Sequence, residues 1–261
     1  LVGGTVWFNG HEIEKMKEKD FRKIRGNEVS IIFQDPMTSL NPVYTIGNQI
    51  VEVIRLHTDK NKADAWARAK ELLELVGINE PEKRLKQYPH ELSGGMRQRV
   101  MIAIALACEP KLLIADEPTT ALDVTIEAQI LRLMKELRDE TGMSVLIITH
   151  NMGVVAEICD YVYVMYAGKI MEQAETFELF DHTMHPYTKG LLDSIPRIGQ
   201  NAERLHTIPG VVPNLLHLSQ GCPFSNRCEY ATDQCRTEKA QLHPVAPDHQ
   251  VRCFRCEEEH Q

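Results

Sequence analysis

The sequence contains no hydrophobic run long enough to cross a membrane. Its longest uninterrupted apolar stretch, residues 100–108, is about half of the roughly 20 residues that a transmembrane helix needs. Basic residues are also in the minority, 29 against 37 acidic ones, and the net charge of −8 argues against a general nucleic-acid-binding protein. Residues 1–4 carry neither the basic region nor the cleavage site of a secretory signal. We therefore expect a chain that is neither membrane-spanning nor secreted, and that reaches any membrane through a partner.

Cysteine is scarce and unevenly placed. Seven cysteines in 261 residues are too few for a disulfide scaffold. Cys108 and Cys159 lie in apolar segments and are expected to be small core residues. The other five fall within the last forty residues, which points to a separate role for the C-terminal segment.

A third absence concerns nucleotide binding. No segment matches G-x-x-x-x-G-K-[ST], the loop whose backbone amides and lysine cradle nucleotide phosphates.

Strand-like and helix-like segments alternate along the first two thirds of the chain. The predicted strands are residues 4–10, 29–33, 111–115, 145–149 and 161–172, the last as two strands around Ala167-Gly168. The predicted helices are residues 45–77, 93–108, 125–140 and 151–159. Such alternation implies an α/β fold with a mostly parallel sheet covered on both faces. Beyond about residue 180 proline, histidine and cysteine become more frequent and the periodicity fades, so we place a domain boundary there.

Two carboxylates, Asp116 and Glu117, follow the apolar strand 111–115. Ligands of open parallel sheets bind beyond the carboxyl ends of the strands, so both side chains are placed to meet a metal ion and phosphate. Taken alone, Asp116-Glu117-Pro118 could equally be a turn that caps the next helix.

Ser93-Gly94-Gly95 opens the predicted helix 93–108. Its small residues, free amides and helix dipole make it a candidate anion site, and the alternative is an ordinary serine N-cap. Gln34 and His150 end two further strands and Asp123 precedes a helix. Each of these three could be a plain surface or capping residue on its own.

Together, these residues in this order resemble the nucleotide-binding subunit of an ABC transporter over nearly the whole chain. The run Leu92 to Arg99 matches the family's signature segment, with Met96 where Gln is usual, and Leu112 to Pro118 matches its magnesium-binding strand. The resemblance implies an ABC-type P-loop ATPase core with a mostly parallel sheet, an inserted helical subdomain at about 41–91 and a cysteine-rich C-terminal extension. The ATPase domain is then expected at 1–180 and the extension at 181–261.

The resemblance also implies roles for single residues. Glu117 would orient the attacking water and His150 would contact the γ-phosphate of ATP. Gln34 and Asp116 would hold Mg²⁺. Ser93, Gly94 and Gly95 would contact ATP bound to the opposite subunit, and Asp123 would cross the dimer interface.

The phosphate loop of the family precedes a segment like Leu1 to Gly4. We therefore interpret the 261 residues as an N-terminally truncated sequence that comes from a complete ATPase. We expect these residues alone to be inactive. A degenerate subunit is the less favoured interpretation.

Several segments resemble the oligopeptide/dipeptide (and nickel) importer branch of the family. They are Gln34 to Pro42, Ala121 to Ile126, His185-Pro186-Tyr187-Thr188 with Leu191-Leu192, Thr207 to Gly210, and Cys222-Pro223-Phe224 with Arg227-Cys228. This implies an ATP-hydrolysing subunit that powers import of oligopeptides or dipeptides. It would pair with a second ABC ATPase as a heterodimer, and two transmembrane permease subunits and a separate substrate-binding protein would complete the system. The expected location is the cytoplasmic face of the cell membrane, without a nucleic-acid partner.

The cysteine spacings in the tail leave its chemistry open. Cys222, Cys228, Cys235 and Cys253 are separated by 5, 6 and 17 residues, which is neither a zinc ribbon nor a ferredoxin pattern. Zinc, an iron–sulfur cluster and free thiols all stay possible on spacing alone. The resemblance implies a [4Fe-4S] cluster on these four, with Cys256 as an alternative to Cys253.

Two other classes compete with peptide import. One is a non-transport ABC ATPase, although the tandem cassettes or long coiled coils usual for that class are absent from the sequence. The other is a catalytically inactive regulatory or metal-binding ABC subunit.

Overall fold

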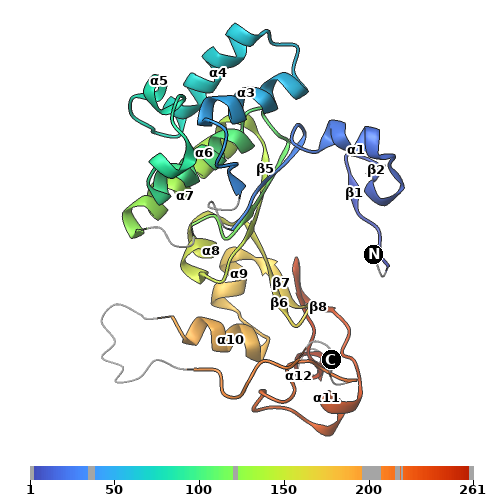
Figure 1. Ribbon diagram of the computed structural model, residues 1–261. Coiled ribbons are helices and arrows are strands. Elements are labelled where there is room, and N and C mark those ends of the chain that lie inside the picture. Colours follow the sequence, from blue (N-terminus) through green and yellow to red (C-terminus); the bar gives the residue numbers. More distant parts are fainter. Residues whose placement is uncertain are drawn as a thin grey trace. The chain divides into compact units, whose positions relative to one another are not determined.

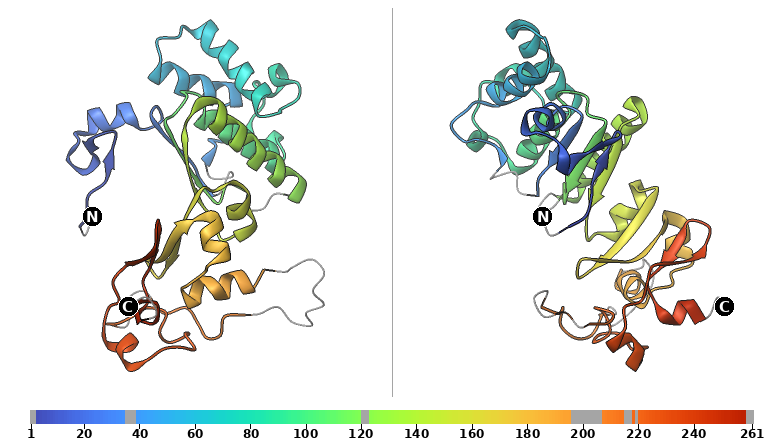
Figure 2. Two further views of the ribbon diagram at one scale, coloured as in Figure 1. Left: turned by 180° about the vertical axis from the view of Figure 1, so that it is seen from behind. Right: turned by 90° about the vertical axis from the view of Figure 1, so that its right-hand side faces the viewer.

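The computed structural model describes residues 3–34, 39–119, 123–195, 207–214, 218 and 220–258. Of residues 257 and 258 it describes the backbone only. The described residues form two compact units, 1–150 and 151–261, which are treated one at a time (Figures 1 and 2). No helix among the described residues is long and apolar enough to span a membrane. The domain boundary near residue 180 stays a prediction, because the division at residue 150 reflects compactness only.

The first unit is built around a parallel sheet of three strands in the order β3-β4-β5. The strands are β3 (Val29–Ile32), β4 (Leu112–Asp116) and β5 (Ser144–Ile148). A separate two-stranded hairpin, β1 (Trp7–Phe8) and β2 (His11–Glu12), precedes them, followed by the 3-10 helix η1 (Ile13–Lys15) and the helix α1 (Glu18–Ile24). The strands expected at 29–33, 111–115 and 145–149 are confirmed. Residues 4–10 were expected to form a short strand that runs into a turn, and they contain the two-residue strand β1 followed by a turn at Asn9-Gly10.

The described helices that follow β3 in this unit pack on one another, and α6 also contacts β3. They are α3 (Ile46–His57), α4 (Lys62–Leu75), α5 (Pro81–Arg84), η2 (Pro89–Glu91), α6 (Gly94–Ala105) and α7 (Val124–Thr141). Ile32, Leu113 and Ala115 of the sheet join one apolar core with side chains of α3, α4, α6 and α7. The helical pattern at 45–77 is two helices, because Asn61 starts a new one by accepting a hydrogen bond from the Asp64 amide, 3.0 Å away.

The expectation that both faces of the sheet are covered is wrong for the described residues of this unit. Ile31, Ile114 and Leu146 are paired in register across the three strands, and Ile31 and Leu146 are 43% and 46% exposed. Successive side chains alternate between faces, so continuous hydrophobicity in these strands does not reveal that one face is open.

The second unit corrects the prediction of a mostly parallel sheet. Its four strands are all antiparallel, in the order β6-β7-β9-β8. They are β6 (Tyr161–Tyr166), β7 (Lys169–Glu175), β8 (His243–Ala246) and β9 (His249–Val251). The hairpin expected around Ala167-Gly168 is confirmed. The parallel arrangement is confined to the sheet that carries the predicted nucleotide residues.

The helices of the second unit are short. They are α8 (Met152–Ile158), α9 (Thr176–Asp181), α10 (Pro186–Asp193), α11 (Asp233–Thr237) and α12 (Phe254–Glu258).

A buried carboxylate ties strands and helices of this unit together. Glu172 of β7 is 0% exposed and accepts hydrogen bonds from the backbone amides of Met184 and His185 at 2.7 and 3.1 Å. The His249 ring contacts Glu172 at 3.0 Å on one side and Glu178 at 3.1 Å on the other. A buried charge is tolerated only when it is paired and hydrogen-bonded, and Glu172 meets that condition.

Candidate nucleotide site

Three predicted residues meet at the carboxyl edge of the parallel sheet. Gln34 follows β3, Glu117 follows β4 and His150 follows β5. Gln34 Nε2 donates to Glu117 Oε2 at 2.7 Å, and His150 Nδ1 lies 3.0 Å from Glu117 Oε1. Because parallel register brings these strand ends to one edge, residues 83 and 33 positions apart from Glu117 become its direct neighbours.

The Glu117 and His150 side chains differ in their exposure to solvent. The Glu117 side chain is 22% exposed and that of His150 is 78% exposed. A carboxylate oxygen facing Nδ1 places the ring proton there, which leaves Nε2 of His150 directed away from the carboxylate.

Glu117 has an unusual backbone conformation. Its φ of +45° lies in the left-handed region, which costs a non-glycine residue roughly 1–3 kcal/mol. The conformation is held from both sides: the Glu117 amide donates to Ile148 O at 2.8 Å, and the buried Gln98 amide donates to Pro118 O. The sequence analysis missed Gln98, because its position between Arg97 and Arg99 gives no local signal that it is buried.

Asp116 is the last residue of β4 and pairs with Ile148 of β5. Its carboxylate makes no hydrogen bond or ion pair with any residue that the structure describes. Gln34 uses its amide nitrogen on Glu117, which leaves its amide oxygen available. Carboxylate and amide oxygens suit Mg²⁺, so the side chains at this edge fit the predicted ion.

Ser93 is the N-cap of α6, and its hydroxyl accepts from the Met96 amide at 3.3 Å. The capping interpretation is therefore confirmed. It does not exclude anion binding, because the amides of the first turn remain directed out of the helix. A Cβ at Gly94 would meet nothing within 4 Å, and one at Gly95 would lie 3.4 Å from Ile126.

Asp123 occupies the N-cap position of α7, but its side chain makes no capping hydrogen bond. The capping role considered for this carboxylate is therefore wrong, and the side chain is exposed. The first turn is instead joined to the preceding segment by Thr119 Oγ1, which donates to Glu127 at 2.8 Å. Positions 120–122 and 35–38 of the predicted motifs lie outside the described residues.

The four predicted cysteine ligands line one small cavity in the second unit. Cys222, Cys228, Cys235 and Cys253 share a space of about 30 Å³, while the buried Cys256 does not line it. Burial raises the pKa of Cys222 to about 11, and the Cys256 thiol lowers the pKa of Cys253 by hydrogen bonding to it. The described residues contain no group of three or more His, Cys, Asp or Glu placed to hold a metal ion.

Comparison with known proteins agrees with these features. Residues 2–120 match the model of the ABC transporter family, and residues 171–235 match that of the oligopeptide/dipeptide transporter C-terminal region. The oligopeptide transport ATP-binding protein OppD of Haemophilus influenzae is 55% identical over 90% of this chain and 73% of its own length. AppD of Bacillus subtilis, also an oligopeptide transport ATP-binding protein, is 53% identical over 99% of this chain and 79% of its own length.

A solved structure shows the same fold. It is the dimeric ATP-binding cassette MJ0796 in a post-hydrolysis state with ADP and Pi, with a TM-score of 0.62 and 26% identity. The match covers 67% of this chain and 74% of the cassette. With relatives this similar along nearly its whole length, the chain belongs to the ATP-binding subunits of the ABC transporter family.

Proposed function

We propose that this chain is the ATP-hydrolysing subunit of an importer of oligopeptides or dipeptides. The observation that carries the proposal is the contact of Gln34 and His150 with the two oxygens of Glu117 at the strand edge. The oligopeptide relatives and the C-terminal region match support peptides as the cargo. None of these relatives is named as a non-transport ATPase or an inactive subunit.

In the proposed mechanism Glu117 acts as the general base. It orients the water that attacks the γ-phosphate of ATP and takes up its proton. His150 and Gln34 hold the carboxylate in place, and the free Nε2 edge of His150 faces the phosphate. Asp116 and Gln34 would hold Mg²⁺, which would supply the charge neutralisation that phosphoryl transfer requires.

The signature segment serves the opposite subunit. The amides of Ser93, Gly94 and Gly95 at the start of α6 bind the γ-phosphate of ATP held across a dimer interface, and Asp123 lies at that interface. The dimeric cassette structure supports this arrangement. A heterodimer with a second ATPase, docked on two permease subunits at the cytoplasmic face of the membrane, and a separate binding protein complete the proposed assembly.

The test is Glu117→Gln in the assembled transporter, with a phosphate loop, which the 261 residues lack, restored upstream of Leu1. The amide keeps the size of the side chain but cannot accept a proton, so ATP turnover should fall by about 10²-fold or more, while ATP binding persists. Glu136→Gln on the exposed side of α7, whose carboxylate only pairs with Arg132, should leave turnover unchanged. Near-normal turnover in Glu117→Gln would reassign the base.

We also propose that Cys222, Cys228, Cys235 and Cys253 bind a [4Fe-4S] cluster. Four cysteine side chains from separate segments line one cavity, and four deprotonated cysteines are the usual ligands of such a cluster. The described residues are not placed to hold a metal ion, so cluster binding would have to draw these side chains together and deprotonate Cys222, whose pKa burial raises. The position of Cys256 outside that cavity favours Cys253 as the fourth ligand. The role is structural: the cluster joins segments that lack a large apolar core of their own.

Anaerobically purified protein should contain iron and acid-labile sulfide. Serine at Cys222, Cys228, Cys235 or Cys253 should remove both, whereas Cys256→Ser is the control that should keep them. Zinc without sulfide would replace the cluster by a zinc site, and the absence of metal would leave free thiols.

A further inference from the structure

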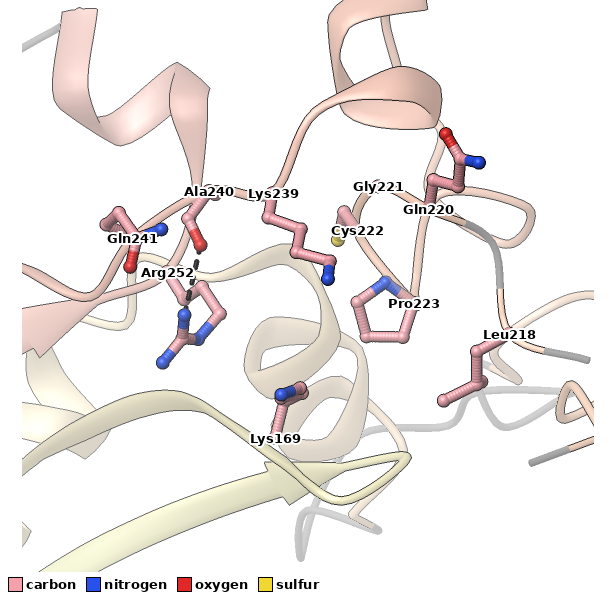
Figure 3. Close-up of a pocket in the computed structure, with 10 residues that line it drawn as sticks. All are labelled: Lys169, Leu218, Gln220, Gly221, Cys222, Pro223, Lys239, Ala240, Gln241 and Arg252. Atoms are coloured by element: carbon pink, nitrogen blue, oxygen red, sulfur yellow. Dashed lines mark hydrogen bonds between the residues drawn. The ribbon is translucent and has the colours of Figure 1, made fainter. Parts of the chain in front are cut away.

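A second cavity in the unit 151–261 adjoins the one lined by the cysteines, with which it shares Cys222, Ala240 and Arg252. It has a volume of about 480 Å³ and lies entirely within the unit 151–261 (Figure 3). Its walls come from the start of β7, the segment before and after Cys222, the segment after α11 and the end of β9. The size falls within the range of small-molecule sites, about 300–1,000 Å³.

Three cationic side chains from three different segments line this cavity: Lys169, Lys239 and Arg252. No aspartate or glutamate among the described residues lines it, although acidic residues outnumber basic ones in the chain. Neither lysine makes an ion pair or hydrogen bond with a described residue. Figure 3 shows Lys239 extending into the space between Arg252 and Pro223, with Lys169 across it.

Arg252 is held rigidly at the wall. Its Nε donates to Ile170 O at 2.8 Å and its Nη1 to Ala240 O at 3.0 Å. Its backbone amide donates to Met171 O at 2.7 Å. The second terminal nitrogen has no partner among the described residues, so one face of a fixed guanidinium remains free to bind an anion.

The opposite wall is equally constrained. A Cβ at Gly221 would overlap the carbonyl oxygen of Cys235, and the Cys222 amide donates to that oxygen at 2.8 Å. Leu218, Pro223 and Ala240 add apolar surface. The site thus combines fixed walls, apolar contact area and unpaired positive charge, which together lower the cost of ordering a bound ligand.

We propose that this cavity binds a small organic anion bearing carboxylate or phosphate groups. Three cations without a carboxylate partner favour at least two negative charges on the ligand. Among the described residues no aromatic side chain lines the cavity, so these residues offer no platform on which a nucleobase could stack. The residues of the proposed ATP site belong to the other unit, 1–150, and occupancy of this cavity would give the C-terminal unit a means of sensing a soluble anion.

Calorimetric titration of the full chain with citrate and with inorganic pyrophosphate tests the proposal. We expect binding of at least one probe that weakens as salt rises. Lys169→Gln and Lys239→Gln should each weaken it by about tenfold or more, because each removes one charge-assisted contact. Neither lysine side chain makes a hydrogen bond or ion pair with a described residue, so neither substitution removes a described polar contact that stabilises the fold. Lys189→Gln is the matched control, since Lys189 is an exposed lysine of α10 that does not line the cavity.

The probe that binds identifies the chemical class. Binding of neither anion overturns the proposal, as does binding that Lys189→Gln weakens as much as Lys239→Gln. Binding to phosphatidylglycerol vesicles without binding to either soluble anion would also overturn it, because the cations would then serve a membrane surface.

Discussion

At the scale of single residues, Glu117 shows why a strained position can hold a functional side chain. Glycine would relieve its positive φ but would remove the carboxylate that Gln34 and His150 contact. The strain is sustained by neighbours on both sides, the Ile148 carbonyl and the Gln98 amide. Gln98 is therefore a positioning residue for the proposed base: its hydrogen bond goes to the carbonyl of Pro118, the residue after Glu117.

Replacing Gln98 by methionine tests this positioning role. Methionine has a similar length but cannot donate to Pro118 O, and leaving a buried acceptor unpaired costs about 1–3 kcal/mol. We expect a lower urea midpoint and a lower kcat for ATP, with little change in KM, in the assembled transporter. A variant that unfolds earlier but keeps its kcat would limit Gln98 to a structural role.

His185 gives a pH-dependent prediction in the second unit. Its Nδ1 accepts from the Tyr187 amide at 3.0 Å at the start of α10, and burial lowers its pKa to about 3. In the unfolded chain the His185 ring becomes protonated as the pH falls below about 6.5, whereas in the folded chain its lowered pKa keeps it neutral down to about pH 3. This residue therefore makes the free energy of unfolding fall as the pH decreases from about 6.5 toward 3. Stability from this source is complete above that range.

His185→Asn keeps an N-cap acceptor and removes the titrating group. The free energy of unfolding, measured by urea titration between pH 7 and pH 4.5, should fall less steeply in the variant. The difference in slope has an upper limit of about 1.4 kcal/mol per pH unit. Parallel slopes in the two proteins would show that His185 does not titrate as its burial requires.

At the scale of elements, the sequence predicted the parallel strands well because each is a short, mostly apolar run that is followed by polar residues. β3 and β5 are also rich in β-branched residues. β3, β4 and β5 fall within one residue of the expected ranges. The sequence predicted that Gln34, Glu117 and His150 each follow a strand, and the parallel register brings these strand ends to one edge. That both oxygens of Glu117 would have a partner did not, because side-chain rotamers depend on contacts between distant segments.

The second unit was harder to predict for a physical reason. Its strands β8 and β9 are four and three residues long, too short for hydrophobic alternation to be recognised. They join β7 through contacts more than seventy positions apart, such as Glu172 with Val251. The cationic cavity depends on the same long-range pairing and leaves no local signal.

The packing of α3 on α4 yields a prediction with an unusual sign. A Cβ at Gly47 would overlap the Trp66 ring and lie 2.8 Å from Leu85 O. Alanine usually stabilises a helix by about 0.5–1 kcal/mol relative to glycine, but overpacking costs about 1–3 kcal/mol. We expect Gly47→Ala to lower the urea midpoint, with Gly94→Ala, where a Cβ meets open space, as the control. A higher midpoint for Gly47→Ala would mean that Trp66 moves without cost.

At the scale of the whole molecule, the proposed catalytic edge is incomplete without a second subunit. Glu117, Gln34 and His150 are joined by hydrogen bonds, whereas the Ser93 hydroxyl bonds only within its own helix turn among the described residues. Such a separation suits two half-sites, one for hydrolysis and one for holding the phosphate of the partner. Under the proposed function, closure of the dimer by ATP would couple nucleotide binding to movement of the permease subunits.

Gly94→Asp tests this coupling without disturbing the fold. The added side chain has open space around it and places a negative charge beside the helix N-terminus, where it would repel a phosphate and neutralise the helix dipole. In a Glu117→Gln background the assembled transporter should retain ATP through gel filtration, and Gly94→Asp should abolish that retention. Gly94→Ala adds a similar volume at Cβ without the charge and should preserve most of it. Equal retention in both variants would mean that the phosphate of the partner binds elsewhere, because a carboxylate beside these amides would repel a phosphate bound to them.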